Sequence, residues 1–560
     1  MSVADDIAAG TGPLFLAASV ELYQPGTLTV PQGQPWATLP WGTLTALAQP
    51  VESTDTLRAS DAGWVTRPAD PPGQVAFPPI LLGSFELDRQ IALAPDGAGA
   101  GAAWGALRLA NPAGTLDAIF TGRNVDGRAI SLRIGRKAVL AHGYAADPAW
   151  AETMEVFAGL GAGLAMEEAA LRVELRDAGY WLERRGGGET YSGAGGLAGT
   201  DALKGKRKPR VRGGTNANPV RNVAPVLVDP AALIYQYTDA AGTVVALYEG
   251  GLAGGITFSA NVTNLYAGAT PAGQYRTDNA KGLFQLGSTP ARQITVDCTG
   301  AFPDATTPSS AALIAREVLL QDAAVPSAYV DSAAFTAVDA AAAWTAGFHL
   351  GLDQQLDAVE IVGRLLGAIG ARLVPLRNGK LSAVLLRAPA VGATPAYAYD
   401  AGQVIACLPR RLSAPLDPPP YRFRVGFARN HTAQTSDIAP TVTAARRQVI
   451  AEPWQVAAAS SADVLAAWRL PSDPDVLDSD LLAPADAQAL ADVLVALWST
   501  VTPRRVYDVT VPLPLVLRHG VGDLVRVAFP VAGLAGGALG LVVGEQLRGG
   551  DGTATFQVLT

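Results

Sequence analysis

Alternating apolar and polar residues mark the predicted β-strands of this chain. Residues 131–134, 171–176 and 421–427 repeat with a period of two, as in Leu-Arg-Val-Glu-Leu-Arg of the second stretch. This period places every second side chain on one face, which is typical of an antiparallel sheet with a single buried face. Further strands are expected at residues 14–23, 506–511, 524–529, 539–543 and 554–559. The pattern predicts two strand-rich blocks, at about 80–185 and 400–560, each forming a small barrel or sandwich.

Apolar residues spaced three or four apart predict helices in the middle of the chain. The clearest helix covers residues 356–369, with Asp353 or Asp357 as its N-cap and Gly370 at its C-terminal end. The Asn378-Gly379 pair then lies between two apolar runs, which is the strongest short hairpin signal. The sequence therefore predicts one compact α+β unit here. Two more helices are expected at residues 313–319, capped by Ser309 or Ser310, and at residues 485–498.

Turn clusters and shifts in composition divide the chain into five predicted segments. The expected fold class is α+β and predominantly β, a multidomain chain with two barrel-like antiparallel β domains and a helix-plus-hairpin middle region. Most of residues 1–75 and all of residues 453–482 are expected to be irregular. The segments are an extended wrapping segment (1–78), a first barrel-like domain (79–185), a β-rich connecting domain that starts with a glycine-rich and basic loop (186–305), an α+β domain with the helix and hairpin (306–400), and a second barrel-like domain (401–560) with a helical insertion at about 453–500.

The composition excludes several classes of protein. Charged residues make up 16% of the 560 residues and apolar residues 49%, the reverse of a disordered chain. No uninterrupted apolar run reaches the roughly 20 residues of a membrane span, and two cysteines do not make a disulfide scaffold. Cys298 and Cys407 could pair or stay reduced. The net charge of −8 argues against specific nucleic-acid binding, whereas low charge suits a subunit of a large assembly.

Motifs for catalysis or cofactor binding are missing from the sequence. No two histidines lie at metal-ligand spacing, and neither a nucleophile elbow nor a phosphate-binding loop is present. The glycines at 159–163 are interpreted as a loop or bulge between strands, since no βαβ pattern surrounds them. We therefore assign no catalytic, cofactor-binding or metal-binding residue. The four histidines are His142, His349, His431 and His519.

Two groups of carboxylates could form binding or catalytic sites, but both are better explained as structural features. Asp473, Asp475, Asp478 and Asp480 could chelate Ca²⁺, but no glycine turn or terminal bidentate glutamate completes the pattern, so a solvated acidic loop is favoured. A glycosidase pair formed by Glu183 with Glu167 or Glu168 would need a defined separation, which nothing in the sequence fixes.

A basic run is the sharpest local feature and the candidate interaction loop. Six cations fall within nine residues, and Tyr191 is the one aromatic residue nearby, so a base-stacking surface is not indicated. The favoured interpretation is an exposed loop between domains or against an acidic neighbouring subunit. The six residues are Lys204, Lys206, Arg207, Lys208, Arg210 and Arg212.

Several stretches resemble the baseplate hub or tail-tip proteins of long-tailed bacteriophages of the siphophage type. The main one is the Lys-Pro-rich run at 203–209 leading into Arg-Asn-Val-Ala-Pro-Val-Leu-Val-Asp-Pro at 221–230. Residues 116–128, 419–430 and 521–525 add to it, so the likeness extends over most of residues 80–560. Residues 216–219 depart from the pattern as extra polar sequence.

The resemblance implies a structural role in the virion. Such hub proteins form homotrimers at the distal end of the tail, and the two barrel-like domains of each subunit together imitate the sixfold tube above. The expected partners are the tail tube or distal tail protein, a central spike, fibre or receptor-binding protein, and the tape-measure protein as a further candidate. Assembly is expected in the host cytoplasm. The expected function is to close the tail tube and adapt its symmetry for host attachment and genome delivery.

Two other classes of function stay open from the sequence. One is a tail-borne hydrolase that degrades cell wall or polysaccharide, and the other is a module that binds host glycans. A hub in a gene-transfer or phage-derived particle is a variant of the main hypothesis. No cofactor is expected for the structural role.

Overall fold

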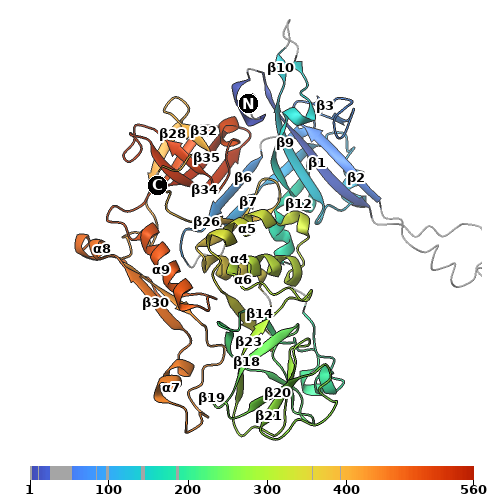
Figure 1. Cartoon of the computed structure of the whole chain (residues 1–560). Helices are drawn as coiled ribbons and strands as arrows, with labels where there is room; N and C mark the ends of the chain where they lie inside the picture. The colour runs from blue at the N-terminus through green and yellow to red at the C-terminus, as the bar shows by residue number, and fades with distance from the viewer. Residues whose placement is uncertain are drawn as a thin grey trace, which may run out of the picture.

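The computed structural model describes residues 3–10, 12–24, 53–82, 85–95, 100–139, 145–183, 188–352, 354–355, 357–390 and 392–560. Strands account for 38% of residues and helices for 19%, in several separate sheets and a helical layer. Figure 1 shows two β-rich bodies side by side at one end, the helices below them, and further sheets at the other end. The predicted class, a predominantly β, multidomain α+β protein with barrel-like parts, is confirmed.

The first sheet has seven strands in the order β2-β1-β9-β12-β13-β8-β5. In β13, burial follows the alternation of the sequence, because Leu171, Val173 and Leu175 face the core while the arginine and glutamate between them are exposed. The short helix α1 (Val3–Ala9) contacts the other body through α10 (Leu513–Val516). The strands are β1 (Leu14–Gln24), β2 (Ser53–Ser60), β5 (Leu81–Leu82), β8 (Ala106–Ala110), β9 (Ala129–Arg136), β12 (Met154–Glu167) and β13 (Ala170–Arg176).

Aromatic packing orders part of the N-terminal segment that was expected to be irregular. Trp64 is fully buried, stacks on Trp150 at a centroid distance of 5.5 Å and contacts Phe15 and Phe77. Residues 53–60 form β2, paired with β1 along its whole length, so the expectation of irregular structure is wrong there. Alternation is weak in β2, and the strand forms because the edge of β1 is available to it. The other two tryptophans of the segment expected to be irregular, Trp36 and Trp41, lie outside the described residues. Short elements nearby are β3 (Trp64–Val65), β4 (Ala76–Phe77), α3 (Asp117–Gly122), β10 (Ala138–Val139), β11 (Ala145–Ala146) and two 3₁₀ turns, Trp150–Glu152 and Ala178–Glu183.

The second body is built on an eight-stranded, nearly closed sheet. Its path runs β27-β33-β34-β35-β32-β28, and the hairpin of β6 and β7 adds to β34. β6 pairs with β34 over five residues, from Gly544 opposite Gln90 to Arg548 opposite Glu86. A hairpin from the N-terminal part of the chain thus adds to a sheet built from C-terminal strands (Figure 1). The strands are β6 (Glu86–Ile91), β7 (Ala100–Trp104), β27 (Tyr397–Tyr399), β28 (Ala406–Arg410), β32 (Val506–Pro512), β33 (Leu524–Val527), β34 (Ala538–Arg548) and β35 (Thr553–Leu559).

The helical layer confirms the expected helix and hairpin. Asp357 caps α6 (Ala358–Gly367) by accepting a hydrogen bond from the backbone N–H of Glu360 at 3.0 Å, while Asp353 lies outside the described residues. Gly370 ends this stretch with a φ of +64°. The hairpin pairs β25 (Ala371–Pro375) with β26 (Leu381–Leu385). The remaining helices are α4 (Ala311–Glu317), which starts after Ser310 and continues as a π-helical turn (Val318–Asp322), and α5 (Ser332–Ala341).

Two sheets form the connecting region. The first has the order β19-β18-β23-β14-β24, with β15 also paired to β23, and the second has the order β16-β17-β22-β21-β20. Residues 216–219 form part of the turn between β14 and β15, where Asn218 N donates to the Thr215 hydroxyl at 3.0 Å. The strands are β14 (Arg210–Gly213), β15 (Val220–Val223), β16 (Val226–Asp229), β17 (Ile234–Gln236), β18 (Gly242–Glu249), β19 (Leu252–Ala253), β20 (Thr257–Asn261), β21 (Gln274–Asp278), β22 (Leu283–Leu286), β23 (Ile294–Gly300) and β24 (Gly347–Leu350).

The insertion in the last segment is more regular than expected. The predicted strand and helix are present as β29 (Arg422–Phe427) and α9 (Pro484–Trp498), but β30 (Gln455–Ser460) pairs with β29 over six residues. The expectation that residues 453–482 are irregular is therefore wrong. Three consecutive alanines in β30 carry no strand signal, and pairing to β29 beneath α9 stabilises it. The other elements are α7 (Ala444–Ala451), α8 (Ala462–Ala467) and β31 (Leu477–Asp478).

Candidate functional site

The basic run predicted as an interaction loop divides into an exposed part and a buried part. Lys204 is exposed in a turn, and Lys208 donates to Glu189 at 2.5 Å with its ammonium 5.9 Å from the Tyr191 ring. Lys206 and Arg207 are half-buried beside them. Whether this exposed part binds a partner stays a prediction.

The last two arginines of the run are buried in β14. Arg212 donates to Asp239 at 2.7 Å and to Asp322 at 3.0 Å, and Arg210 reaches the same two carboxylates at 3.0 and 3.1 Å. The guanidinium of Arg212 also lies 5.1 Å from the Phe302 ring. These two cations connect the β14 strand to the helical layer rather than facing solvent. We call this set of two arginines and two aspartates the central cluster.

A second buried cluster joins three parts of the chain. Glu545 of β34 accepts from Arg89 of β6 at 2.6 Å and from Arg377, in the turn of the β25–β26 hairpin, at 2.9 Å. Arg89 also donates to the carbonyl of Pro375 at 2.8 Å, and the Arg377 carbonyl accepts from Ala158 N of the first sheet at 2.6 Å. We call Arg89, Arg377 and Glu545 the junction cluster, because they connect the two β bodies through the hairpin.

The hairpin turn fits against the first sheet only because it contains a glycine. Gly379 has a φ of +77°, and a Cβ at this position would lie 2.9 Å from the carbonyl oxygen of Ala158. The Asn378-Gly379 signal therefore serves the turn itself and also the close approach of Arg377 to the junction.

The charges of the junction cluster are fixed by their surroundings. Two arginines hold the pKa of the buried Glu545 carboxyl down to about 2, against the desolvation that acts to raise it. His519 lies in the same interior and bonds through Nε2 to the Tyr399 hydroxyl at 2.7 Å. That hydroxyl donates to the Leu515 carbonyl, so His519 Nε2 carries the proton, and the buried Nδ1 has no hydrogen-bond partner among the described residues. Burial and the neighbouring Arg377 lower the pKa of His519 to about 3.

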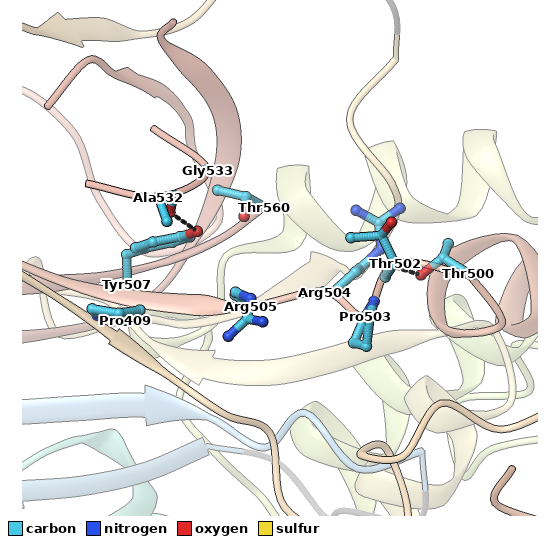
Figure 2. Close-up of a pocket in the computed structure, with 10 residues that line it drawn as sticks. All are labelled: Pro409, Thr500, Thr502, Pro503, Arg504, Arg505, Tyr507, Ala532, Gly533 and Thr560. Carbon is cyan, nitrogen blue, oxygen red and sulfur yellow. Dashed lines mark hydrogen bonds between the residues drawn. The ribbon is translucent and has the colours of Figure 1, made fainter. Parts of the chain in front are cut away.

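A cavity of about 550 Å³ opens beside the eight-stranded sheet of the second body (Figure 2). The Tyr507 hydroxyl donates to the Ala532 carbonyl at 2.8 Å, and the Thr500 hydroxyl donates to the Thr502 carbonyl at 2.8 Å. Arg504 donates to the Leu497 carbonyl at the end of α9. These side chains donate their hydrogen bonds to backbone carbonyls and so stabilise the local fold. The part of the cavity wall that the structure describes holds no paired acid and base.

The other candidate residues are placed as follows. Asp473 pairs with Arg422 and Arg424, and the Asp478 and Asp480 carboxylates pair with Arg429 and Arg364 at 2.7 and 2.9 Å. Glu167 pairs with Arg108 and Glu183 with Arg176. The glycines at 159–163 lie inside β12, where the pairing to β13 shifts by one residue, so the expected bulge is present within a strand rather than between two strands. Cys298 and Cys407 are free and buried. His142 lies outside the described residues.

The described residues hold neither a metal-binding cluster of three or more side chains nor a helix that could span a membrane. No set of three or more His, Cys, Asp or Glu side chains there is arranged to hold a metal ion. None of the helices in the same part of the chain is long and apolar enough to cross a membrane.

No protein-family model matches the chain, and no curated protein does. Among solved structures, a 43 kDa tail protein of a Shewanella oneidensis prophage matches with 10% identity and a TM-score of 0.34, over 85% of this chain and 93% of its own. A tail protein from Neisseria meningitidis matches with 10% identity and a TM-score of 0.34, over 85% and 92%. A prophage tail protein from Listeria monocytogenes matches with 6% identity and a TM-score of 0.25, over 85% and 94%. The chain is similar to phage tail proteins.

Sequence reasoning missed the junction cluster and one pairing of histidines. Arg89, Arg377 and Glu545 are far apart in the chain and carry no local motif, so only the register of β6 on β34 reveals them. His349 and His431 are likewise distant in sequence, yet their ring centroids lie 5.2 Å apart. Neither the cluster nor the histidine pair can be found from the sequence without knowing which strands pair.

Proposed function

We propose that this protein is a non-enzymatic structural component of a phage tail, and that it acts as the baseplate hub. It closes the distal end of the tail tube and adapts the symmetry of the tube to a central spike or fibre. The proposal rests first on the sequence resemblance over residues 80–560.

The observation that carries the proposal is the connection between the two β bodies. The β6–β7 hairpin leaves the first body and completes the sheet of the second, and the junction cluster fixes it there. Two barrel-like bodies joined in this way keep a constant relative position. Such a fixed pair is what a subunit needs if three copies are to present six equivalent barrels to a tube.

Exposed apolar side chains at the edge of the eight-stranded sheet support burial against other subunits. Ile405, directly before the terminal strand β28, is 58% exposed, and Leu408, on that strand, is 65% exposed. A large chain with only 16% charged residues and exposed apolar groups of this kind fits a subunit whose surface is covered in the assembled particle. The proposed partners are two further copies of the chain, the tail tube or distal tail protein, and a spike, fibre or receptor-binding protein.

Electron microscopy of the virion tests the proposal. Antibody or gold labelling of this protein should mark the distal tip of the tail, and averaged images should show three copies there. Leu408→Asp should reduce assembly into tails while the purified chain stays folded, with the exposed Val139→Asp in the first body as a control. Label along the shaft, at the head, or absent from the particle would overturn the hub assignment. Turnover of peptidoglycan or capsule by the purified chain would favour a hydrolase.

A further inference from the structure

The cavity of about 550 Å³ beside the eight-stranded sheet is not used by the proposed function, and we call it the end cavity. It lies where β28 ends, β32 begins and β35 ends, next to the turn between β33 and β34. Pro503, Arg505 and Tyr507 line it from alternate positions along one stretch of chain (Figure 2), and Pro409 lies opposite Tyr507 in the pairing of β28 with β32. The open end of a barrel is a frequent position for a binding site, and the volume falls within the usual range of about 300–1,000 Å³.

The wall of the end cavity combines apolar surface with positive charge. Pro409, Pro503 and the ring of Tyr507 supply apolar surface, and Arg504 and Arg505 supply two cations. No aspartate or glutamate side chain belongs to the described part of the wall. Because the whole chain has a net charge of −8, the charge of this wall is opposite in sign to that of the molecule.

The two arginines of the wall have no counter-ion among the described residues. Arg505 is exposed, and its guanidinium forms neither an ion pair nor a hydrogen bond with any of them. Arg504 donates through Nε to the Leu497 carbonyl at the end of α9, which leaves its two terminal NH₂ groups without a partner in the described part of the chain. Burial lowers the pKa of Arg504, as expected for a cation whose desolvation no nearby acid offsets. An anionic group in the cavity would therefore be the first acid that either guanidinium meets.

The rim of the end cavity is apolar and exposed. Val501 lies between two residues that line the cavity and is 48% exposed, and the exposed Leu408 is next to Pro409. The Trp468 indole donates to the Val501 carbonyl at 3.0 Å, and Arg469, which follows it in the chain, is exposed and forms no ion pair with a described residue. A small free anion would leave these apolar groups uncovered, whereas a segment of protein would cover them and supply the anion.

We propose that the end cavity binds a segment of a partner protein in which an acidic side chain is next to a large apolar one. The apolar side chain lies against Pro409, Pro503 and the Tyr507 ring. The carboxylate pairs with Arg505 and with the terminal NH₂ groups of Arg504, since a planar guanidinium matches the two oxygens of a carboxylate. The inference rests on the cavity and its charges, and it does not depend on the hub assignment.

Selection of random short peptides from a display library against the full chain tests the site. We expect the enriched peptides to be acidic and to carry Leu, Phe or Trp next to Asp or Glu. Selection against Arg505→Glu should lose these sequences, because the variant places a carboxylate where the peptide's carboxylate binds. Arg548→Glu is the matched control, since Arg548 is exposed at the opposite end of the same sheet, and it should enrich the same acidic peptides as the wild type.

Fluorescence anisotropy with the most enriched peptide measures the affinity. Binding should be at least tenfold weaker to Arg505→Glu and unchanged to Arg548→Glu. On the wild-type chain, replacing the acidic residue of the peptide by its amide, or the apolar residue by serine, should each weaken binding at least tenfold. Because these peptide changes are measured on the unaltered chain, they decide the question even if Arg505→Glu fails to fold.

Four results would overturn the proposal. The first is a selection that enriches no sequence, or sequences that lack either the acid or the apolar residue. The second is equal binding to Arg505→Glu and the wild type. The third is full displacement of the peptide by inorganic phosphate at an ionic strength matched with sodium chloride, which would leave a site for a simple anion. The fourth is self-association of the chain that Arg505→Glu alone abolishes, which would assign the cavity to a second copy.

Discussion

The two buried ionic clusters differ in what they connect. The central cluster balances two arginines with two aspartates, and its partners are 27 and 110 residues apart in the chain. In the junction cluster one carboxylate, Glu545, serves two arginines that lie 456 and 168 residues away. The first cluster therefore links the β14 strand to the neighbouring helical layer, whereas the second fixes the relative positions of the two β bodies and the β25–β26 hairpin.

The difference in charge balance predicts that the two clusters differ in how much stability is lost when one acid is removed. Removing one acid from the central cluster leaves a second carboxylate beside both arginines. Removing Glu545 leaves two buried guanidinium groups with no carboxylate of the described residues in direct contact, although the carbonyls of Pro375 and Val516 still accept from them. A buried charge without a counter-ion is costly, so removing the acid of the junction cluster should destabilise the fold more than removing one acid of the central cluster.

Glu545→Gln is expected to have the largest effect. The variant should lose about 3–5 kcal/mol of unfolding free energy, because two buried cations lose their counter-ion. Chemical denaturation measures the loss, and hydrogen exchange should show faster exchange in β6 and β7 before the rest of the fold opens. Glu174→Gln, in an exposed pair with Arg172 at 3.8 Å, is the control and should change stability by less than about 0.5 kcal/mol. Equal effects of the two substitutions would contradict the role given to the junction.

Asp322→Asn should have a smaller effect, localised elsewhere. Arg210 and Arg212 keep Asp239, so we expect a loss of about 1.5–3 kcal/mol, the range for a hydrogen bond to a charged group. Hydrogen exchange should quicken in β14 and the end of α4, and β6 should keep its wild-type protection. If β6 loosened as much as it does in Glu545→Gln, the two clusters would form one network and the comparison would fail.

The pH dependence separates the clusters further, because a buried histidine, His519, lies close enough to the junction cluster for the charges of Arg377 and Glu545 to act on it. The folded pKa of His519 is about 3, below the ordinary value of 6.5, so the unfolded chain takes up this proton first as the pH falls. The stabilisation is complete above pH 6.5 and is lost toward pH 3, with a slope of about 1.4 kcal/mol per pH unit. His519→Gln, which can still donate to Tyr399, should flatten the curve of unfolding free energy between pH 6 and 4. Curves that stay parallel to the wild type would rule out His519 as a source of the slope.

Local signals predicted much of the fold and little of the sites. Alternation located β13 and β29, and the spacing of apolar residues with Asp357 and Gly370 located α6, because these patterns follow directly from burial on one face. β30 was not predicted because its alanines have low strand propensity, and the strand forms only through its pairing with β29. Long-range register was not predictable, and every contact of Glu545 depends on it.

The basic run shows the same limit within nine residues. Composition makes the six cations look alike, yet the run enters β14 at Arg210, and from there the strand places Arg210 and Arg212 beside Asp239 and Asp322. Lys204 lies in a turn before the strand, and Lys208 lies in the irregular segment between that turn and β14. Whether a cation in this run is structural or available depends on a strand boundary that charge alone does not reveal.

Lys208→Gln should therefore cause the smallest loss of unfolding free energy of these substitutions, because it removes an exposed ion pair rather than a buried one. The Glu189 side chain in its ion pair is 71% exposed, so solvent screens the interaction and the loss should be within about 0.2–1 kcal/mol. Salt distinguishes this pair from the buried clusters, because screening weakens exposed pairs and leaves buried ones largely unchanged. The difference between Lys208→Gln and the wild type should disappear at about 1 M salt, while that of Asp322→Asn persists. A loss at Lys208 as large as at Asp322, or one that salt does not reduce, would mean that the basic turn is held as firmly as the strand it precedes.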